Sequence, residues 1–208
     1  MHRHINQFIL REGLIMIKSS LVTTLFLLLL CGIAYPLVTT AVGRTVFPHQ
    51  ANGSFIKEHG HVVGSELIGQ MFTSPEYLHG RPSPHHYSSY PLKTPEDQIQ
   101  PVTGGSNLSN NNRTLLQRVK TERNTFSQDN DVPTQEVPID ILTASGSGLD
   151  GQITKQAADM QIHRIAQHSG LTEEKVRTII NQHTVQQNDS VIVNVLEVNL
   201  DIKHLMQH

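Results

Sequence analysis

Cysteine is nearly missing from this sequence, whose single copy is Cys31. Residues 45–208 therefore contain no cysteine and can form no disulfide bond within the chain. This excludes the disulfide-braced scaffolds of small eukaryotic extracellular domains and suits a domain of a bacterial envelope protein.

An excess of positive charge is missing too. Residues 45–208 hold 12 Lys and Arg against 17 Asp and Glu, which gives this part of the chain a formal charge of −5. A domain with that balance has no general attraction for polyanions. The charge therefore argues against nucleic acid or an anionic membrane surface as its partner.

No charged residue and no histidine occurs between Leu21 and Val42, a run of 22 mostly apolar residues. As a helix rising about 1.5 Å per residue it would be about 33 Å long, enough to cross a hydrocarbon core of roughly 30 Å. Pro36 is expected to kink the outer half of the run, because proline cannot donate the helical hydrogen bond. Threonine side chains can satisfy the backbone carbonyls in such a helix. The run predicts a single transmembrane helix.

Two cleaved segments have similar composition. A secretory signal peptide also has a basic start, but its apolar core is usually about 7–15 residues long, shorter than this run. Thr39-Thr40-Ala41 would make only a weak cleavage site. A lipoprotein signal ending at Cys31 would need a small residue just before the cysteine, and the chain has Leu30 there. We therefore favour an uncleaved anchor, with a cleaved signal as the alternative.

The residues beside the run predict its orientation. Residues 1–20 carry three basic residues and one acidic residue, a modest bias that places the N-terminus in the cytoplasm. We expect a cytoplasmic head at residues 1–20, a transmembrane helix at 21–42 and a periplasmic domain at 45–208, in a single-pass protein of the bacterial inner membrane. Met1 and Met16 are both possible translation starts. The outer 164 residues are enough for one compact domain.

The periodicity of the outer part predicts an α/β (mixed α+β) domain carried on the single N-terminal transmembrane helix. Apolar spacing favours helices at about residues 112–126 and 154–168, the second of them ended by Gly170. A further helix is expected after Thr172, whose side chain can cap its first turn.

The last strongly apolar segment alternates apolar and polar residues from Val191 to Ile202, with one shift of phase. This pattern predicts a strand with a bulge near Val195 and Leu196. Residues 73–109 are rich in Pro, Ser, His, Tyr and Asn, so they are expected to be irregular, and residues 127–136 are expected to form a surface loop.

The spacing of Ala166, Gly170 and Val176 also occurs in DNA-binding helix-turn-helix motifs. A small residue, a tight turn and an apolar contact are what any two short helices need in order to cross closely. A recognition helix beginning with Glu173 and Glu174 would meet DNA phosphates with the wrong charge. We interpret the segment as a structural helical hairpin.

No arrangement typical of an active site occurs in the sequence. Ser145-Gly146-Ser147-Gly148 departs from the Gly-x-Ser-x-Gly of a nucleophile elbow, and Gly104-Gly105-Ser106-Asn107 lacks the Gly-Lys-Ser/Thr of a phosphate-binding loop. We interpret both as tight turns. The 13 histidines include the pairs His59/His61 and His85/His86, without a His-Glu-x-x-His motif or cysteine partners. No catalytic residue and no metal site is therefore predicted.

Several motifs together resemble the C subunit of the Kdp-type potassium-transporting ATPase, in order over about residues 16–208. The motifs are Tyr35-Pro36, Phe47-Pro48-His49-Gln50-Ala51-Asn52-Gly53-Ser54, Val63-Gly64-Ser65-Glu66-Leu67-Ile68-Gly69-Gln70, Arg81-Pro82-Ser83, Gly104-Gly105-Ser106-Asn107-Leu108, Val137-Pro138-Ile139-Asp140, Thr143-Ala144-Ser145-Gly146-Ser147-Gly148-Leu149-Asp150, Gln161-Ile162-His163-Arg164, Val193-Asn194-Val195-Leu196 and Asn199-Leu200.

The resemblance implies a non-enzymatic accessory subunit of a high-affinity, ATP-driven potassium import complex. Its partners would be a channel-like potassium-binding subunit, a P-type ATPase subunit and a small single-span subunit. The complex uses ATP, magnesium and potassium, and this subunit would have no cofactor of its own. The family's C subunit supports assembly and activity and is described as a catalytic chaperone that raises the ATP affinity of the pump subunit.

The predicted topology conflicts with direct ATP binding, because 164 of the 208 residues would lie outside the cytoplasm, away from ATP. We therefore expect a role in assembly and in control of the ion-entry side. Two other functions stay open. An anchored envelope hydrolase would require a paired serine and histidine, and a binding or sensor module would be stable and functional alone.

The outer half of the apolar run holds a set of small residues and threonines, which are Gly32, Ala34, Pro36, Thr39 and Thr40. Small residues let helices approach closely, and threonine can form hydrogen bonds across a helix pair. A helix that only anchored the chain would not need them. We expect these residues to face a partner helix.

Overall fold

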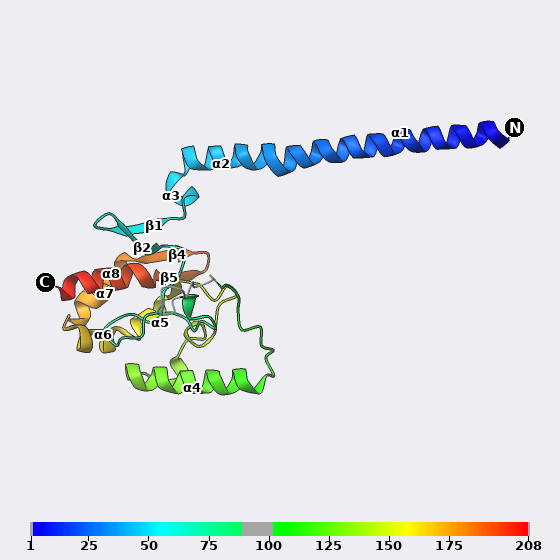
Figure 1. The fold of residues 1–208 in the computed structure, drawn as a ribbon. Coiled ribbons are helices and arrows are strands. Elements are labelled where there is room, and N and C mark those ends of the chain that lie inside the picture. The colour runs from blue at the N-terminus through cyan, green and yellow to red at the C-terminus, as the bar shows by residue number, and fades with distance from the viewer. Residues whose placement is uncertain (1, 89–101, 208) are drawn as a thin grey trace, which may run out of the picture. The chain divides into compact units, whose positions relative to one another are not determined.

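The computed structural model describes residues 2–88 and 102–207. The chain divides into two compact units, residues 1–54 and residues 55–208. The first unit is helical and the second is a mixture of short helices and two small sheets (Figure 1). The predicted fold class, a mixed α/β domain on one long apolar helix, is confirmed.

The first unit is a run of three helical segments, α1 (His2–Leu29), the π-helical turn η1 (Leu30–Ala34) and α2 (Tyr35–Val46). Its part from Gly13 to Val46, 34 residues, is the only helix in the described residues that is long and apolar enough to cross a membrane. It includes the predicted run from Leu21 to Val42. Residues 14–42 are all exposed, so no residue that the structure describes covers this helix.

The π-helical turn lies directly before Pro36. The N–H of Tyr35 donates to the carbonyl of Leu30, five residues back rather than four. Pro36 follows without an N–H to donate, so the turn widens where one helical hydrogen bond is missing. A kink was predicted at Pro36, and the structure has a π turn directly before this residue.

Helix α2 ends at Val46 because Phe47 precedes Pro48, and the residue before a proline is disfavoured in the helical conformation. Phe47 has a φ of −129°. Pro48 then begins the short helix α3 (Pro48–Ala51), since a proline is tolerated in the first turn of a helix.

The second unit begins with an antiparallel hairpin of β1 (Phe55–Glu58) and β2 (His61–Ser65). His59 and Gly60 form its tip, both with positive φ, the geometry that matches the twist of a two-residue hairpin. Glu58 lies 2.6 Å from Nε2 of His204, which joins the hairpin to the last helix.

A three-stranded antiparallel sheet forms the centre of the second unit. Its order is β3 (Gln152–Thr154), β5 (Ser190–Asn194) and β4 (Thr184–Gln187), so β5 is the middle strand. Ile153 lies opposite Val193, and Val185 opposite Ile192.

Five α-helices belong to the part of this unit that the structure describes. They are α4 (Arg113–Asn130), α5 (Lys155–Asp159), α6 (Ile162–Ser169), α7 (Glu173–Gln182) and α8 (Val195–Met206), with 3₁₀ turns at His86–Ser88, Thr134–Glu136 and Asp140–Leu142. Helices α6 and α7 form the expected helical hairpin, with Gly170 at a φ of 75° ending α6 and the Thr172 side chain capping α7.

The prediction of a bulged strand from Val191 to Ile202 is wrong. The strand β5 ends at Asn194, whose side chain accepts hydrogen bonds from the N–H groups of Leu196 and Glu197 and so caps α8. Val195, Val198, Asn199 and Ile202 are buried at the spacing of one helix face. The shift in the apolar pattern near Val195 therefore marks the change from strand β5 to helix α8.

Two other boundaries also differ from prediction. The segment expected as one helix at 154–168 is two helices, α5 and α6, with Thr154 capping the first of them. Helix α4 continues four residues into the segment expected as a loop and ends at Asn130, before Asp131 at a φ of 52°. Residues 73–88 and 102–109 contain no strand or α-helix, as expected, while 89–101 lie outside the described residues.

The core of the second unit is made of aliphatic side chains from the 3₁₀ turns, the middle of the sheet and helices α5 to α8. Its buried members are Leu78, Val137, Ile141, Leu142, Ile153, Ala157, Ala158, Ile162, Ile165, Val176, Ile179, Ile180, Val193, Val195, Val198 and Ile202. Leu78 lies in an irregular segment, whose backbone is not paired in a helix or a sheet. Side chains from other elements therefore have to hold this segment in position.

Candidate functional site

The predicted interface residues of the apolar helix all lie on exposed surface. Gly32, Pro36 and Thr39 follow one another at helical spacing and share one face, with open space beside Gly32. Ala34 is two residues from Gly32 and from Pro36, which directs it away from that face. The hydroxyl of Thr39 donates to the carbonyls of Tyr35 and Pro36, at 3.0 and 3.1 Å. This hydroxyl can still accept a hydrogen bond from a neighbour.

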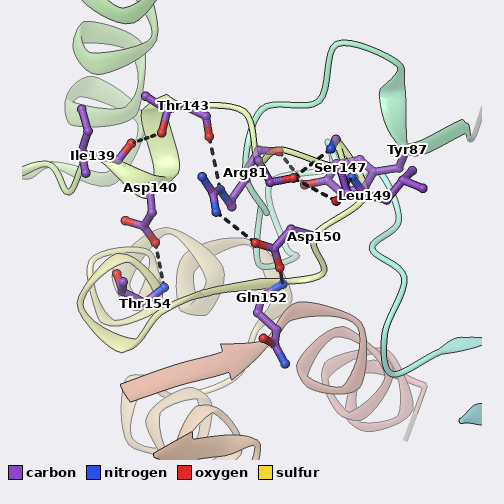
Figure 2. A network of polar contacts seen from close by, with 12 residues as sticks. Arg81, Tyr87, Ile139, Asp140, Thr143, Ser147, Leu149, Asp150, Gln152 and Thr154 are labelled. Atoms are coloured by element: carbon purple, nitrogen blue, oxygen red, sulfur yellow. Dashed lines mark hydrogen bonds and ion pairs between the residues drawn. The ribbon is translucent and has the colours of Figure 1, made fainter. Parts of the chain in front are cut away.

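In the outer domain, Arg81 is at the centre of a polar network (Figure 2). Its Nη1 donates to Oδ2 of Asp150 at 3.0 Å, and its Nε donates to the carbonyl of Thr143 at 3.2 Å. The other carboxylate oxygen of Asp150 accepts the N–H of Gln152 at 3.1 Å. One ion pair thus fastens an irregular segment to the start of β3.

Ser83 and Tyr87 continue this network. The Ser83 hydroxyl donates to the carbonyl of Gly148 at 2.7 Å and accepts the N–H of Tyr87 at 2.9 Å. The Tyr87 hydroxyl donates to the carbonyl of Arg81 at 2.6 Å. Three parts of the chain, near residues 81, 87 and 148, are locked together by these bonds.

Two glycines allow the close approach that the network requires. A Cβ at Gly69 would lie 2.5 Å from Cε1 of Tyr87, and a Cβ at Gly148 would lie 2.5 Å from the carbonyl oxygen of Gly104. Gly148 also has a φ of 67°, within the tight turn that closes from its N–H to the carbonyl of Ser145. The Gly-Ser stretch is a tight turn, as predicted.

A second set of polar side chains holds the segment around Leu78. The amide of Asn199 accepts the N–H of Leu78 at 2.7 Å and donates to its carbonyl at 2.9 Å. The amide of Gln161 does the same for His79, at 2.9 and 3.1 Å. Each amide replaces the hydrogen bonds that a neighbouring strand would have supplied.

Arg164 completes this set, which we call the amide clamp (Gln161, Arg164 and Asn199). Its side chain is buried and donates to the carbonyls of Pro75 and Tyr77. It also donates to Asn130 at 3.0 Å and to Gln161 at 2.6 Å. The clamp joins α4, α6 and α8 to one irregular segment.

The family is decided by comparison with known proteins. A family model described as "KdpC: K+-transporting ATPase, c chain" matches residues 17–204. The chain belongs to the KdpC family.

Relatives from several bacteria agree. A potassium-transporting ATPase KdpC subunit of Clostridium kluyveri is 39% identical over 194 residues, covering 89% of this chain and 92% of the relative. One from Clostridioides difficile is 39% identical over 202 residues, covering 91% and 97%. A KdpC subunit 2 of Staphylococcus aureus is 39% identical over 191 residues, covering 91% and 98%. The resemblance inferred from the sequence motifs is confirmed.

The motifs by which the KdpC family was inferred meet in the network. The N–H of Gly69 donates to the carbonyl of Leu149 at 2.8 Å, and the N–H of Gly104 donates to that of Ser147 at 2.7 Å. The amide of Asn194 donates to the carbonyl of Glu66 at 3.0 Å. Motifs far apart in the sequence are therefore parts of one hydrogen-bonded structure.

Tyr87 and Arg164 keep their protons at neutral pH, so both side chains act as fixed hydrogen-bond donors rather than as proton-transfer groups. Burial and the nearby Asp150 raise the pKa of Tyr87 to about 12, so its hydroxyl stays protonated and remains a donor. Burial lowers the pKa of Arg164 to about 10, which still leaves the guanidinium charged at neutral pH.

A groove of about 350 Å³ opens beside the network. Phe72, His79, Arg81 and Glu122 are among its lining residues. Burial raises the pKa of Glu122, and burial together with Arg164 lowers the pKa of His79. Both shifts favour the neutral form, so the groove disfavours charge on these two side chains.

No metal site is formed by the residues that the structure describes, in which no three His, Cys, Asp or Glu side chains gather suitably for an ion. His59 lies in the hairpin tip, and Nδ1 of His86 lies 3.3 Å from Sδ of Met71. His183 instead bridges two carboxylates, with Nδ1 at 3.1 Å from Glu197 and Nε2 at 2.7 Å from Asp201.

Sequence reasoning missed the amide clamp and the His183 bridge. The Gln161 and Arg164 pair at a spacing of three residues on a helix was a usable signal, because such residues share a face. Asn199 gave no signal, since the segment that contains it was assigned to a strand.

Proposed function

We propose that this chain is a non-catalytic accessory subunit of an ATP-driven potassium import complex, needed for assembly and activity of its ion-conducting and ATP-hydrolysing subunits. The match of residues 17–204 to the KdpC family supports this most strongly. The relatives are named as subunits of a potassium-transporting ATPase, so a subunit's role follows for this chain.

The proposed arrangement in the membrane has the N-terminus in the cytoplasm, one uncleaved span and the domain outside, in the bacterial inner membrane. It is supported by the exposed apolar helix from Gly13 to Val46 and by the basic residues that precede residue 21. ATP would then be on the opposite side of the membrane from the domain. We therefore assign the domain to assembly and control on the ion-entry side rather than to nucleotide binding.

The proposed partners are a channel-like potassium-binding subunit, a P-type ATPase subunit and a small single-span subunit. The face with Gly32, Pro36 and Thr39 is the proposed surface for a partner helix. Thr40, four residues after Pro36, lies beside Thr39 on this face, whereas Ala34 is directed away from it. A helix turn widened next to a proline leaves one carbonyl without a main-chain donor. In lipid such a group is costly, and a donor on a partner helix would satisfy it.

Co-purification tests this proposal. The tagged full-length chain is expressed with the three other subunits and compared with a variant in which residues 21–42 are replaced by a plain leucine span. We expect the natural chain to retain the other subunits and to restore growth at limiting potassium. The leucine variant should insert but retain them less well. Equal retention would show that the span is only an anchor.

Topology is tested separately with reporters fused after the last residue. A reporter that works only outside the cytoplasm should be active, and a cytoplasmic reporter should be silent. A mature protein that begins after Ala41 would replace the anchor by a cleaved signal. Turnover of an ester or peptide by the purified chain would instead favour the hydrolase.

A further inference from the structure

The basic residues of the outer domain are concentrated on α4. Residues 113–123 hold four basic side chains and one acidic, a formal charge of +3, whereas the rest of residues 55–208 hold eight basic and 16 acidic, a charge of −8. The net charge of −5, by which an anionic surface seemed excluded, conceals this separation. Over its whole length α4 (the green helix in Figure 1) also holds Asp129 and has a formal charge of +2, against −7 for the rest of the domain.

One face of α4 combines this charge with an exposed leucine. Arg113, Leu116 and Lys120 are spaced three and four residues apart and share a face. Leu116 is 57% exposed, and Arg113 and Lys120 are also exposed. Neither basic side chain has an ion pair or hydrogen bond in the part of the chain that the structure describes.

An open groove of about 610 Å³ runs along the helix beside Arg113, Gln117 and Arg118. Arg118 lies on the other side of α4 from Leu116 and pairs with Glu122, with Nε and Oε1 3.7 Å apart, and its Nε and Nη2 are shielded from solvent. The basic side chain of the groove that is open to solvent is therefore Arg113, which also belongs to the face with Leu116.

We propose that this face of α4 docks on the anionic phospholipid headgroups of the membrane that anchors the chain. Arginine and lysine would bind the headgroup phosphates, and Leu116 would enter the boundary with the acyl chains. Basic residues around an exposed apolar side chain are the pattern of helices that lie on a membrane surface. An acidic protein surface would also pair with the basic residues. The boundary between headgroups and acyl chains accommodates both these residues and the exposed side chain of Leu116.

The short connection to the span favours lipid as the occupant. Eight residues separate the end of α2 at Val46 from the start of β1 at Phe55. Such a linker spans at most roughly 30 Å, so the bilayer is always within reach of the domain and has a high effective concentration. The acidic remainder does not prevent docking, because charges beyond about 8–10 Å are screened at physiological salt and the domain is several times wider.

A tryptophan reporter tests the docking. The chain has no tryptophan, so Leu116→Trp in the full-length protein gives a single fluorescent site. The variant is reconstituted into nanodiscs of bromine-labelled lipid, with and without phosphatidylglycerol. We expect blue-shifted, strongly quenched emission with the anionic lipid only, and loss of this difference at high salt. The matched control is Val185→Trp, also at an exposed apolar position but on β4, which should respond equally weakly to both lipids.

Charge reversal supplies the second measurement. Arg113→Glu with Lys120→Glu, in the Leu116→Trp protein, should reduce the ratio of docked to free domain by at least about 25-fold, since each basic residue near an anionic surface contributes about fivefold. Equal quenching of both tryptophans, or equal quenching in neutral and anionic lipid, would overturn the proposal. So would a tryptophan at 116 that is shielded only after the partner subunits are added, which would identify an acidic protein surface instead.

Discussion

The apolar helix and the outer domain satisfy their polar groups in opposite ways. In the helix, the hydroxyls of Thr39 and Thr45 donate to carbonyls three or four residues back. In the domain, Asn199 reaches the backbone of Leu78, 121 residues away in sequence. Local bonds make the helix independent of the rest of the chain, whereas the domain exists only when distant segments have come together.

This difference predicts which single substitutions will lower the unfolding free energy of the domain. The helix has no interior of its own, and its stability comes from lipid and from whatever partner covers it. In the domain, removing one buried partner leaves other polar groups without hydrogen bonds, and each such group is costly. Unfolding of the detergent-solubilised chain in urea, followed by circular dichroism, reports mainly on the domain.

Loss of the clamp arginine should have the largest effect. Arg164→Met keeps the length of the side chain but removes the guanidinium donor from the carbonyls of Pro75 and Tyr77 and from the amide of Asn130, so we expect the domain to lose about 3–5 kcal/mol of unfolding free energy. Arg177→Met, at an exposed position of α7, is the control and should change it by less than about 0.5 kcal/mol. Similar losses for both variants would show that the clamp does not support the domain.

A methyl group in the network should have the next largest effect. Gly69→Ala places a Cβ 2.5 Å from the Tyr87 ring and 3.0 Å from the carbonyl oxygen of Asp150. Overpacking of this kind costs about 1–3 kcal/mol. Gly146→Ala is the matched control, because nothing lies within 4 Å of its Cβ. An unchanged urea midpoint for Gly69→Ala would mean that the Tyr87 ring and the backbone at Asp150 can shift to accommodate the methyl group without loss of stability.

The same contrast explains what the sequence could and could not reveal. The apolar helix was predictable because its signal is local: an uncharged run of sufficient length. The Thr172 cap and Gly170 stop were predictable for the same reason. The segment from Val191 to Ile202 misled because its β-branched residues fit a strand at its start and a helix after Asn194, and tertiary packing decided between them.

The amide clamp could not be predicted, because its side chains come from α6 with its N-cap and from α8, and they meet on an irregular segment. Gln161 and Asn199 look like ordinary polar helix residues until the fold places Leu78 and His79 beside them. The network around Arg81 was only partly foreseen. Its motifs were recognised by resemblance, but no pattern in them indicated that Ser83 would bond to the carbonyl of Gly148.

A smaller, pH-dependent effect is expected from His79. Burial lowers its pKa from 6.5 in the folded state, so below about that pH the unfolded chain takes up the proton first. The unfolding free energy should therefore fall as the pH decreases from about 7 toward the folded pKa, by at most about 1.4 kcal/mol per pH unit from this group.

The variant His79→Gln isolates this contribution. Glutamine can still donate to the carbonyl of Ser74 but does not titrate, so its pH dependence should be flatter than that of the natural chain. The difference between the two proteins at each pH removes the contributions of other groups, such as Glu122. His61→Gln, at an exposed position, should keep the natural slope. A slope that His79→Gln leaves unchanged would assign the pH dependence to other residues.

The smallest effect on the domain should come from the helix itself. Gly32→Leu fills open space on an exposed face, so the urea unfolding of the domain should shift by less than about 0.5 kcal/mol. The same variant should reduce co-purification with the other subunits, because a leucine there prevents close approach of a partner helix. Ala34→Leu, two residues later and directed away from that face, is the matched control for added volume and should leave co-purification intact. If Gly32→Leu instead destabilised the domain, the two units would be energetically coupled, and the independence inferred from their local and distant hydrogen bonds would be wrong.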